Sequence, residues 1–296
     1  MALTLAEAAK LSQDTLLTGV IETVIYDSPI LQVLPFIEIV GNGLTYNREN
    51  QAATAAFYDV GDAWAESTPT FTQVTATLKI LGGDADVDNF LRATRSNIQD
   101  LEAAVIQLKA KAVQQKFDDT FINGDATIDP KAFDGIDKLC SSGQTVSMGT
   151  NGATLTLDKL DELIDKIKGG RPDLLLMSKR SRRKLTSLSR ASGSGFLETD
   201  RNQFGQIIPV YNGIPIGVCD WISDAKTVGT STDCSTVYVI QLGEGGVAGL
   251  TSPGGLQVER VGSLEAKDAT RTRVKWYVAA ALFNALKLAK LVGVQD

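Results

Sequence analysis

Residues 61–124 read GDAWAESTPTFTQVTATLKILGGDADVDNFLRATRSNIQDLEAAVIQLKAKAVQQKFDDTFING. A short acidic patch that contains Trp64 leads into a stretch in which threonine alternates with apolar residues, and a long amphipathic segment follows. Alternation with a period of two predicts a strand, and apolar residues at steps of three and four predict a helix. This order of elements favours a subunit that makes extended contacts with neighbouring subunits over a compact enzyme.

The helix is the most strongly patterned element of the chain. Ser96 and Gln99 form an S-x-x-Q capping box at its start. Asn123 and Gly124 supply its stop, because these residue types tolerate the backbone that ends a helix. Between them runs a predicted apolar stripe of about six turns. Its expected members are Ile98, Leu101, Val105, Leu108, Ala112, Phe117 and Phe121.

Upstream of the helix, residues 41–82 are predicted to form one long β-hairpin. Residues 41–50 are its first arm, 51–70 its weakly patterned tip, and 71–81 its returning strand. A connection of this length without a packed core is unusual inside a compact domain and is often functional or ordered by a partner. We therefore expect a neighbouring subunit to order the tip at 59–69. The expected contact residues are Asp59, Trp64, Glu66 and Phe71.

The N-terminal segment combines a helix signal with an irregular apolar run. A capping box at Thr4 begins a short amphipathic helix that is expected to end near Gly19. Residues 20–39 are strongly apolar but are interrupted by Pro29 and Pro35. Such an apolar surface must be buried, either on the chain's own core or across a neighbouring subunit. The residues leave both possibilities open.

The remainder of the chain is predicted to mix short strands with two helices. One helix covers 157–167, with Thr156 or Asp158 as its cap, and the other is a basic run that follows a buried strand at 173–178. Loops are expected at 125–155 and 193–205, and strands at 207–211, 214–219, 236–242 and within 256–294, where 270–277 alternate with a period of two.

Composition excludes several classes of function. The net charge is −6 and the pI is about 4.9, which disfavours general nucleic-acid binding because affinity for phosphate depends on Lys and Arg. The chain contains no histidine, which removes Ser-His-Asp and Cys-His catalysis and histidine-ligated zinc. The cysteines at 140, 219 and 234 form no C-x-x-C pair, so we expect free thiols.

Neither hydropathy nor the N-terminus indicates a membrane. No apolar run approaches the length that spans a bilayer. The first residues, MALTLAEAAKLSQDTL, have no basic segment before their apolar residues and do not resemble a signal peptide. We expect a protein that is made and kept in a cytoplasm, with no membrane partner.

Two partial motifs fail when their surroundings are considered. Asp84, Asp86 and Asp88 imitate the start of a calcium-binding loop, but Asn89 and Arg95 stand where the turn glycine and the bidentate glutamate belong. We expect a solvated acidic turn here.

The second motif is a G-x-G-x-x-A run after a strand, which lacks the helix that a dinucleotide site requires. Its residues are Gly243, Gly245 and Ala248, with Pro253 close behind.

Adjacent carboxylates do not supply a catalytic pair either. Asp118 and Asp119 point about 100° apart on a helix. We therefore predict no catalytic residue, no cofactor and no metal ion.

The only dense basic cluster is the run Lys179, Arg180, Arg182, Arg183 and Lys184. A solvated helix face, with Leu185 and Leu188 turned inward, is one interpretation. Contact with DNA or with an acidic partner subunit is the other. Because no aromatic residue is interleaved, the run does not resemble a platform for stacking single-stranded bases.

Taken in order, these segments resemble the Hong Kong 97-type major capsid proteins of tailed phages. The resemblance covers nearly the whole chain, and its specificity lies in the order and spacing of its segments. SPILQVLPFIEIVGNGLTY resembles the lead into the extended hairpin of that family, the E-loop, and DAWAESTPTFTQVTATLKILGGDADVDNFL resembles its tip, return strand and exit. NIQDLEAAVIQLKAKAVQQKFDDTFINGD resembles the long spine helix, DLLLMSKRSRRKL the axial strand and helix, and RTRVKWYVAAALFNALKLAKL the closing segment.

The resemblance implies an α+β fold with an arm, an E-loop, a peripheral domain and an axial domain. The implied division is 1–40 for the N-terminal arm, 41–82 for the E-loop, 83–150 for the peripheral domain with its spine helix, 151–255 for the axial domain and 256–296 for the return to the peripheral domain.

Two departures from the family pattern limit what the resemblance implies. Some members carry a long scaffolding segment that is later cleaved. Only residues 1–40 precede the E-loop here, so a separate scaffolding protein or an already trimmed chain is expected. Some members form cross-links from an E-loop lysine. No lysine occurs between Asn42 and Leu78, so such cross-links are not expected.

The function that the resemblance implies is structural. Copies of the chain would assemble, as hexamers and pentamers, into an icosahedral shell around phage DNA. Assembly would take place in the host cytoplasm with scaffolding and portal proteins, and contact with the packaged DNA would be weak and non-specific. Two alternatives stay open: an encapsulin-like nanocompartment with the same fold and, in another class, a cytoplasmic enzyme that uses carboxylates or lysine.

Overall fold

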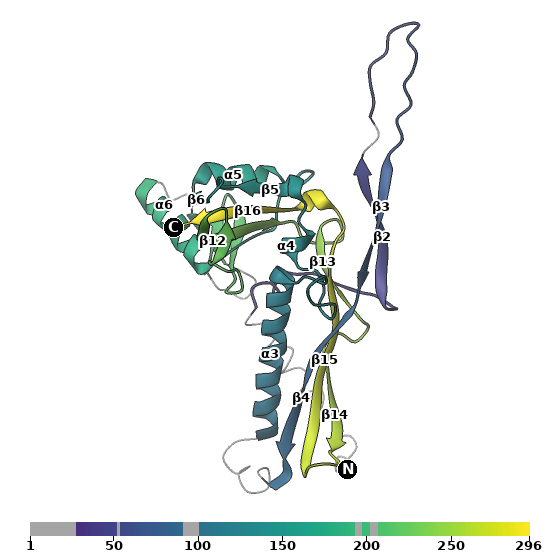
Figure 1. The fold of residues 1–296 in the computed structure, drawn as a ribbon, viewed down its shortest axis with the longest axis vertical. Helices are drawn as coiled ribbons and strands as arrows, with labels where there is room; N and C mark the ends of the chain where they lie inside the picture. Colours follow the sequence, from purple (N-terminus) through teal and green to yellow (C-terminus); the bar gives the residue numbers. More distant parts are fainter. Residues whose placement is uncertain (1–27, 52–53, 91–100, 193–196, 202–206) are drawn as a thin grey trace.

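The structure is a computed structural model that describes residues 28–51, 54–90, 101–192, 197–201 and 207–296. The described residues form a five-stranded sheet, a nine-stranded sheet and a separate two-stranded hairpin. Figure 1 shows that the long helix α3 and the five-stranded sheet extend to one side of the nine-stranded sheet, whereas the hairpin projects in the opposite direction. The predicted helix near residues 4–19 and the helix cap at Ser96 lie outside the described residues.

The long strand β15 organises the five-stranded sheet. It pairs along one stretch with β4 and along others with β14 and β13, and β1 adds in parallel to β13. Thr270, Thr272 and Val274 are buried while the residues between them are more exposed, which confirms the predicted period of two. The bounds are β1 Phe36–Glu38, β4 Lys79–Asp88, β13 Val247–Thr251, β14 Gln257–Ser263 and β15 Ala269–Leu282.

Helix α3, Leu101–Asn123, covers one face of this sheet. Its buried face carries Ile106, Ala110, Val113, Phe117 and Phe121, at steps of three and four. The ring centroid of Phe117 lies 4.9 Å from that of Trp276 on β15 and 6.0 Å from that of Phe36 on β1. The predicted positions of Phe117 and Phe121 in the apolar stripe are therefore confirmed.

Two positions of the predicted stripe, Leu108 and Ala112, are wrong, whereas Val105 is partly buried and packs against the core. Ile98 and the side chain of Leu101 lie outside the described residues. Leu108 is 69% exposed and Ala112 is also exposed, because the helix buries the face that contains Ile106 and Ala110. The predicted end of the helix is confirmed, since the Gly124 N–H donates to the Thr120 carbonyl oxygen at 2.8 Å. A Cβ on Gly124 would lie 2.3 Å from the carbonyl oxygen of Phe133, which explains a glycine at this turn.

The nine-stranded sheet buries both of its faces. On β7, Leu174–Met177, two residues, Leu175 and Met177, point to a core shared with helices α5, Leu157–Asp165, and α6, Lys179–Ser192. Leu174 and Leu176 join the core that contains α3. The four buried residues of β7 confirm the predicted strand at 173–178. The main order is β5 Thr145–Ser147, β16 Leu288–Gln295, β12 Ser231–Ile240, β7 Leu174–Met177, β10 Ile214–Val218, β9 Ile207–Tyr211 and β8 Leu197–Arg201, with β6 Ala153–Thr154 on β16 and β11 Lys226–Val228 on β12.

Both predicted helices of this region are present. Helix α5, Leu157–Asp165, begins after Thr156, whose side chain accepts a hydrogen bond from the Lys159 N–H, so Thr156 is the cap. Helix α6, Lys179–Ser192, contains the basic run. The loop predicted at 193–205 is partly wrong, because β8 lies within it and pairs with β9. The loop predicted at 125–155 contains α4 Ile136–Leu139, the 3-10 turn η1 Ser142–Gln144, β5 and β6, and a second 3-10 turn, η2, covers Ala285–Lys287.

The described part of the arm is buried on the chain's own core. Ile30, Leu31, Leu34 and Ile39 are each less than a tenth exposed. Of the two possibilities that the sequence left open, burial on the chain's own core therefore holds for these residues, while Val40 is almost fully exposed.

Strands of the two large sheets cross the limits that the resemblance implies. β5 lies within 83–150 and β16 within 256–296, yet both belong to the nine-stranded sheet. β13 lies within 151–255 and belongs to the five-stranded sheet. The chain therefore passes between the two sheets at several points.

Candidate assembly surfaces

The projecting hairpin consists of β2, Gly43–Gln51, and β3, Thr70–Thr77, paired antiparallel. The predicted returning strand at 71–81 is in fact two strands, because β4 leaves the hairpin after Leu78 and pairs with β15. The hairpin is anchored at its base. The Tyr46 hydroxyl donates to the Leu282 carbonyl oxygen at 2.9 Å, and Arg48 donates to the same oxygen at 2.7 Å.

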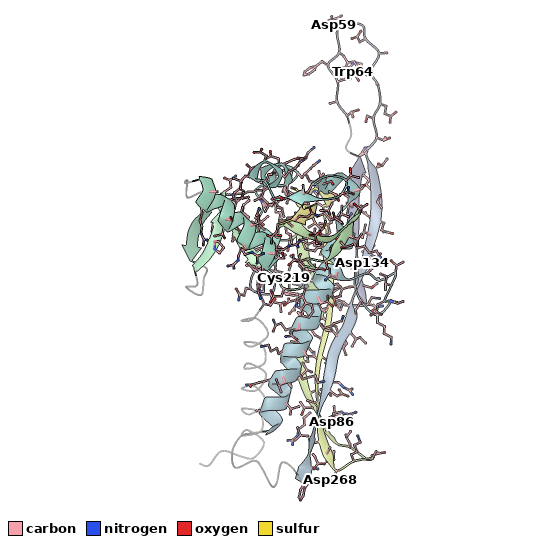
Figure 2. All side chains as sticks on the ribbon, turned by 60° about the vertical axis from the view of Figure 1, so that its left-hand side comes forward. Asp59, Trp64, Asp86, Asp134, Cys219 and Asp268 are labelled. Carbon is pink, nitrogen blue, oxygen red and sulfur yellow. The ribbon has the colours of Figure 1, made fainter. Side chains whose placement is uncertain are left out.

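The hairpin tip, residues 54–70, stands clear of the rest of the molecule. Figure 2 shows Asp59 and Trp64 at its far end, distant from Cys219 in the body. The Trp64 ring stacks on Tyr58 with a centroid separation of 4.4 Å, yet Trp64 remains 81% exposed and Phe57 is fully exposed. The Asp59 N–H donates to the Asp62 carboxylate at 2.7 Å, which closes the turn.

The predicted contact residues of the hairpin fall into two places. Asp59, Trp64 and Glu66 lie together in the tip, and Phe71, which is 64% exposed, lies at the distal end of β3. The tip carries three carboxylates, those of Asp59, Asp62 and Glu66, and no Lys or Arg. It is therefore an acidic surface with exposed aromatic rings.

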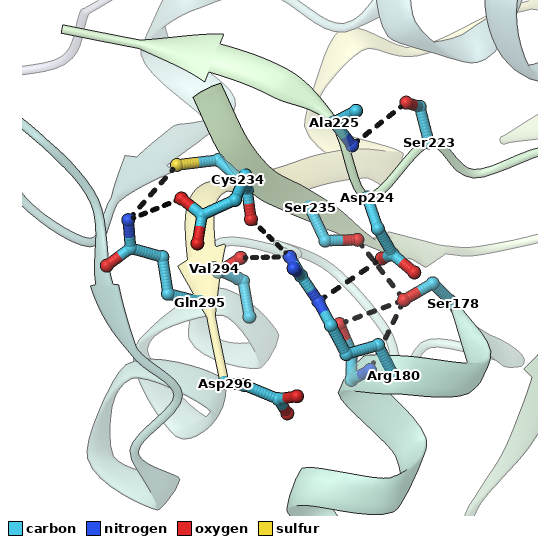
Figure 3. Close-up of polar contacts among 12 residues, drawn as sticks. Ser178, Arg180, Ser223, Asp224, Ala225, Cys234, Ser235, Val294, Gln295 and Asp296 are labelled. Carbon is cyan, nitrogen blue, oxygen red and sulfur yellow. Dashed lines mark hydrogen bonds and ion pairs between the residues drawn. The ribbon is translucent and has the colours of Figure 1, made fainter. Parts of the chain in front are cut away.

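Three of the five cations in the basic run of α6 make contacts within the chain. Figure 3 shows Arg180 donating to the carbonyl oxygens of Asp233 and Val294, at 2.5 and 3.2 Å. Lys179 pairs with Asp220 at 2.6 Å, and Arg183 pairs with the carboxylate of Asp296 at 2.5 Å.

The other two cations of the run, Arg182 and Lys184, are exposed and partly exposed. Among the residues that the structure describes, the side chains of Arg182 and Lys184 make no hydrogen bond or ion pair. Leu185 is buried and Leu188 is partly buried, as predicted for a helix with one face inward.

The acidic run before α3 is a strand, so the predicted solvated turn is wrong. Asp84 and Asp86 lie on β4 opposite Arg273 and Arg271 of β15. Each arginine donates two hydrogen bonds to its carboxylate, with the Nε–Oδ1 distance 2.6 Å in both pairs. These hydrogen bonds hold the pKa of both carboxyl groups below their ordinary value.

Sequence reasoning missed the role of Asp118. Its carboxylate is buried at 3% exposure and accepts a hydrogen bond from the Ser28 hydroxyl at 2.7 Å, which ties the segment at Ser28 to α3. Burial raises the pKa of Asp118 to about 6, against the opposing effect of hydrogen bonds from Ser28 and Gln114. Asp119 instead pairs with Lys116 at 3.2 Å, so the two adjacent carboxylates point to different partners. No local signal links Ser28 to a residue 90 positions away.

Other chemistry-bearing groups are few among the described residues. All three cysteines are free thiols, as predicted. They are also buried, and burial raises the pKa of Cys219 to about 11. Within the described ranges, no group of three or more Cys, Asp or Glu side chains is placed to hold a metal ion.

No described helix is long and apolar enough to cross a membrane. After Gly243 the chain turns directly into β13, so the helix of a dinucleotide site is missing, as expected.

Comparison with known families and structures gives a consistent result. The phage capsid family matches residues 9–292 of the chain. No curated protein sequence matches it.

Several solved structures share the fold at low sequence identity. The holo-SrpI encapsulin complex from Synechococcus elongatus PCC 7942 superposes with a TM-score of 0.70 at 18% identity, covering 90% of this chain and 87% of that chain. The capsid of the native GTA particle gives 0.65 at 14% identity, covering 92% and 91%. A structure from Mycobacterium phage Bobi gives 0.62 at 14% identity, covering 91% of both chains.

Proposed function

Because this chain belongs to the phage capsid family, we propose that its projecting hairpin is the contact through which each copy of this shell-forming major capsid protein holds its neighbour. The fold is that of the Hong Kong 97-like capsid proteins, as the resemblance implied. The hairpin takes the place of the E-loop, α3 that of the spine helix, and the nine-stranded sheet that of the axial domain.

The observation that carries this proposal is the exposed aromatic tip on a hairpin without a core of its own. Phe57, Val60 and Trp64 are all at least four-fifths exposed. Contiguous exposed apolar groups of this kind mark interaction sites, and buried aromatic anchors supply much of the binding energy of an interface. Asp59, Glu66 and Phe71 flank the anchors and complete the contact surface.

We assign the other partners from the same premise. Copies of the chain form the hexamers and pentamers of an icosahedral virion shell that encloses phage DNA, assembled in the host cytoplasm with scaffolding and portal proteins. Contact with DNA is weak because the chain is acidic and three of the five cations in the basic run of α6 are paired within it. Arg182 and Lys184 are the remaining candidates for contact with DNA or with an acidic partner surface.

A nanocompartment is the second candidate, because the SrpI encapsulin complex superposes with a TM-score of 0.70. The two functions differ in what the shell encloses. Shells purified from the native host and treated with nuclease would retain protected DNA if the protein builds a phage head. They would retain a protein cargo and no protected DNA if it builds a compartment.

The family is structural, and no enzymatic role is proposed for this chain. The expected absence of catalytic residues and cofactors stays a prediction.

The first prediction tests the hairpin tip. The double variant Phe57→Ala/Trp64→Ala removes two exposed anchors without touching the core, and truncating one interface hot spot costs about 2 kcal/mol or more. Shell yield, measured by negative-stain microscopy and sedimentation, should fall by at least about tenfold. The matched control is Ile128→Ala, a residue that is 84% exposed in the loop after α3. Normal shells from the double variant would overturn the proposal.

A further inference from the structure

A cavity of about 280 Å³ lies between α3 and the turn that follows β10. Gln114 and Asp118 of α3 line it on one side. Trp221 of the turn and Pro29 of the segment before β1 also line it. The Asn123 side chain donates a hydrogen bond to the Trp221 carbonyl oxygen at 2.9 Å, which holds the turn against the helix. This α3 cavity is therefore built from three parts of the chain that are distant in sequence.

Asp118 brings a buried carboxylate to the α3 cavity. It is 3% exposed, and one of its oxygens accepts a hydrogen bond from the Ser28 hydroxyl at 2.7 Å. That hydroxyl accepts a hydrogen bond from the Leu31 N–H at 3.1 Å, and its single proton is already used by Asp118. Among the described residues, no Lys or Arg pairs with Asp118. Because a buried carboxylate without a cation is costly, a positive charge in the cavity would be stabilised.

Gln114 adds a second acceptor that lacks a donor. It lies one helical turn before Asp118, on the same face of α3, and its amide nitrogen serves the Asp118 carboxylate. Gln114 is only 4% exposed, and its Oε1 atom is buried without a hydrogen-bond partner among the described residues. Buried polar atoms in native proteins almost always have a partner. The α3 cavity therefore combines a negative charge with an acceptor that needs an N–H or O–H donor.

We propose that the α3 cavity is a binding site for the ammonium end of an organic amine. A single ammonium group supplies both the positive charge that Asp118 lacks and a donor for Gln114, because it carries three N–H groups. The alkyl part of the amine would contact Pro29 and Val218, which also line the cavity. The Trp221 indole offers an aromatic face that attracts cations.

Two other occupants fit these groups less well. Water would satisfy the Gln114 oxygen but would bring no charge to Asp118, and the cavity is much larger than the roughly 10–15 Å³ that one water requires. A divalent metal ion prefers six or more oxygen ligands. Within the described ranges, no group of three or more carboxylate or thiol side chains is placed to hold one.

The charges around the α3 cavity favour an amine with one positive charge. Lys111 of α3 and Asp220 of the turn line the cavity and are exposed. Asp220 pairs with Lys179 at 2.6 Å, so its charge is largely compensated. The Cys219 thiol stays neutral at pH 7.5, because burial raises its pKa to about 11. Lys111 would therefore repel a compact dication more than an amine with a single charge.

The binding test uses unassembled full-length subunits, so its result does not depend on the proposed shell contact. Propylammonium chloride is titrated at pH 7.5, and binding is followed by saturation-transfer NMR and by the Trp221 indole N–H signal. Tetramethylammonium chloride is the matched probe, since it carries the same charge and no N–H donor. We expect propylammonium to bind and tetramethylammonium to bind at least about tenfold more weakly.

The adjacent carboxylates of α3 provide matched variants. Asp118→Asn should weaken propylammonium binding at least about tenfold, because it removes the buried charge. Asp119→Asn makes the same change one position away, where the carboxylate pairs with Lys116, and should leave binding unchanged. Binding to the unmodified chain should also weaken at least about tenfold from pH 7.5 to pH 4.5, as Asp118 becomes protonated.

Three results would each overturn the proposal. These are equal binding of the two probes, an unchanged affinity in Asp118→Asn, and an equal loss in Asp118→Asn and Asp119→Asn. The third would show that propylammonium responds only to the net charge of the helix.

Assembled shells distinguish the two sources of such an ammonium group. If shells still bind propylammonium, the natural occupant is a free amine. If they do not, and one lysine resists acetylation in unmodified shells but not in Asp118→Asn shells, the occupant is a lysine side chain of a second copy. Shells with neither property would hold no amine in the α3 cavity, which would overturn the proposal for the assembled protein.

Discussion

Asp118 is the residue whose surroundings conflict most with its charge. It lies in α3 and contacts Ser28, it is 3% exposed, and among the described residues it has no cationic partner. An ionised carboxylate in such a place loses hydration that its hydrogen bonds from Ser28 and Gln114 only partly replace. The folded chain is therefore less stable when Asp118 is charged, because the cost of burying the charge exceeds what these two hydrogen bonds return.

The second prediction concerns the pH dependence that follows. The pKa of Asp118 in the folded chain is about 6, above its ordinary value of 3.8, so the folded state binds this proton more tightly than the unfolded state. The resulting stabilisation is complete below about pH 4 and is lost as the pH rises through about 6. Its size is on the order of 2–3 kcal/mol, since one pKa unit corresponds to about 1.4 kcal/mol.

Asp118→Asn is the variant that isolates this effect. It keeps the shape of the side chain and cannot ionise, so it should be more stable than the unmodified chain at pH 7.5 and close to it at pH 4.5. The measurement is the difference in free energy of unfolding between the two chains, by chemical denaturation of unassembled subunits at each pH. A difference that does not grow between pH 4.5 and pH 7.5 would contradict the assignment. The two chains are compared at each pH because Asp84 and Asp86, whose pKa values are lowered, stabilise the fold less as the pH falls. This opposite effect is the same in both chains and cancels in the difference.

At the scale of the element, α3 carries two apolar stripes and buries only one. Ile106, Ala110, Val113 and Phe117 face the five-stranded sheet, while Leu108 remains 69% exposed. The Phe117 ring contacts Phe36, Phe121, Phe133 and Trp276, with centroid separations of 4.9–6.0 Å. The aromatic cluster around Phe117 therefore sets the rotation of the helix on the sheet.

The third prediction compares these two faces. Phe117→Ala should lower the free energy of unfolding of the subunit by about 3–5 kcal/mol, because it removes a fully buried ring and leaves a cavity. Leu108→Ala should change it by less than about 0.5 kcal/mol. Urea denaturation of unassembled subunits measures both. Equal effects of the two changes would contradict the burial of Phe117 and the exposure of Leu108.

At the scale of the whole molecule, one core joins the two large sheets. Leu176 and Tyr238 of the nine-stranded sheet belong to the same buried cluster as Phe117 of α3 and Val274 of β15. The arm adds Ile30 and Leu34 to this cluster. Because both large sheets share this core, we expect them to unfold together. Of the hairpin, only residues near its base pack against the core.

The fourth prediction is that the unassembled subunit unfolds in one cooperative transition. Near-ultraviolet circular dichroism, which reports the aromatic cluster around Phe117, and far-ultraviolet circular dichroism should give the same midpoint in urea. Leu176→Ala should shift both midpoints together, because this residue lies in the shared core. Two separate transitions would show that the sheets unfold independently.

Much of the fold followed from neighbouring residues alone. The stop of α3 at Asn123, the cap of α5 at Thr156, the buried strand β7 and the alternation in β15 are all local patterns, and each is present. The order of these elements along the chain also indicated the capsid family. Helix capping and periodicity depend on residues that are close in sequence, so the sequence by itself determined them.

Tertiary structure decided what depends on distant partners. The local sequence around Asp84 and Asp86 predicts an acidic turn. Arg271 and Arg273, more than 180 positions away, pair with these carboxylates, and the two aspartates lie in a strand instead. The returning strand of the hairpin divides at Leu78 because β15 captures β4. Asp118 is buried at a place where Ser28, 90 positions away, donates a hydrogen bond to it. Local propensity leaves several pairings nearly equal in free energy, and the burial of a common core selects among them.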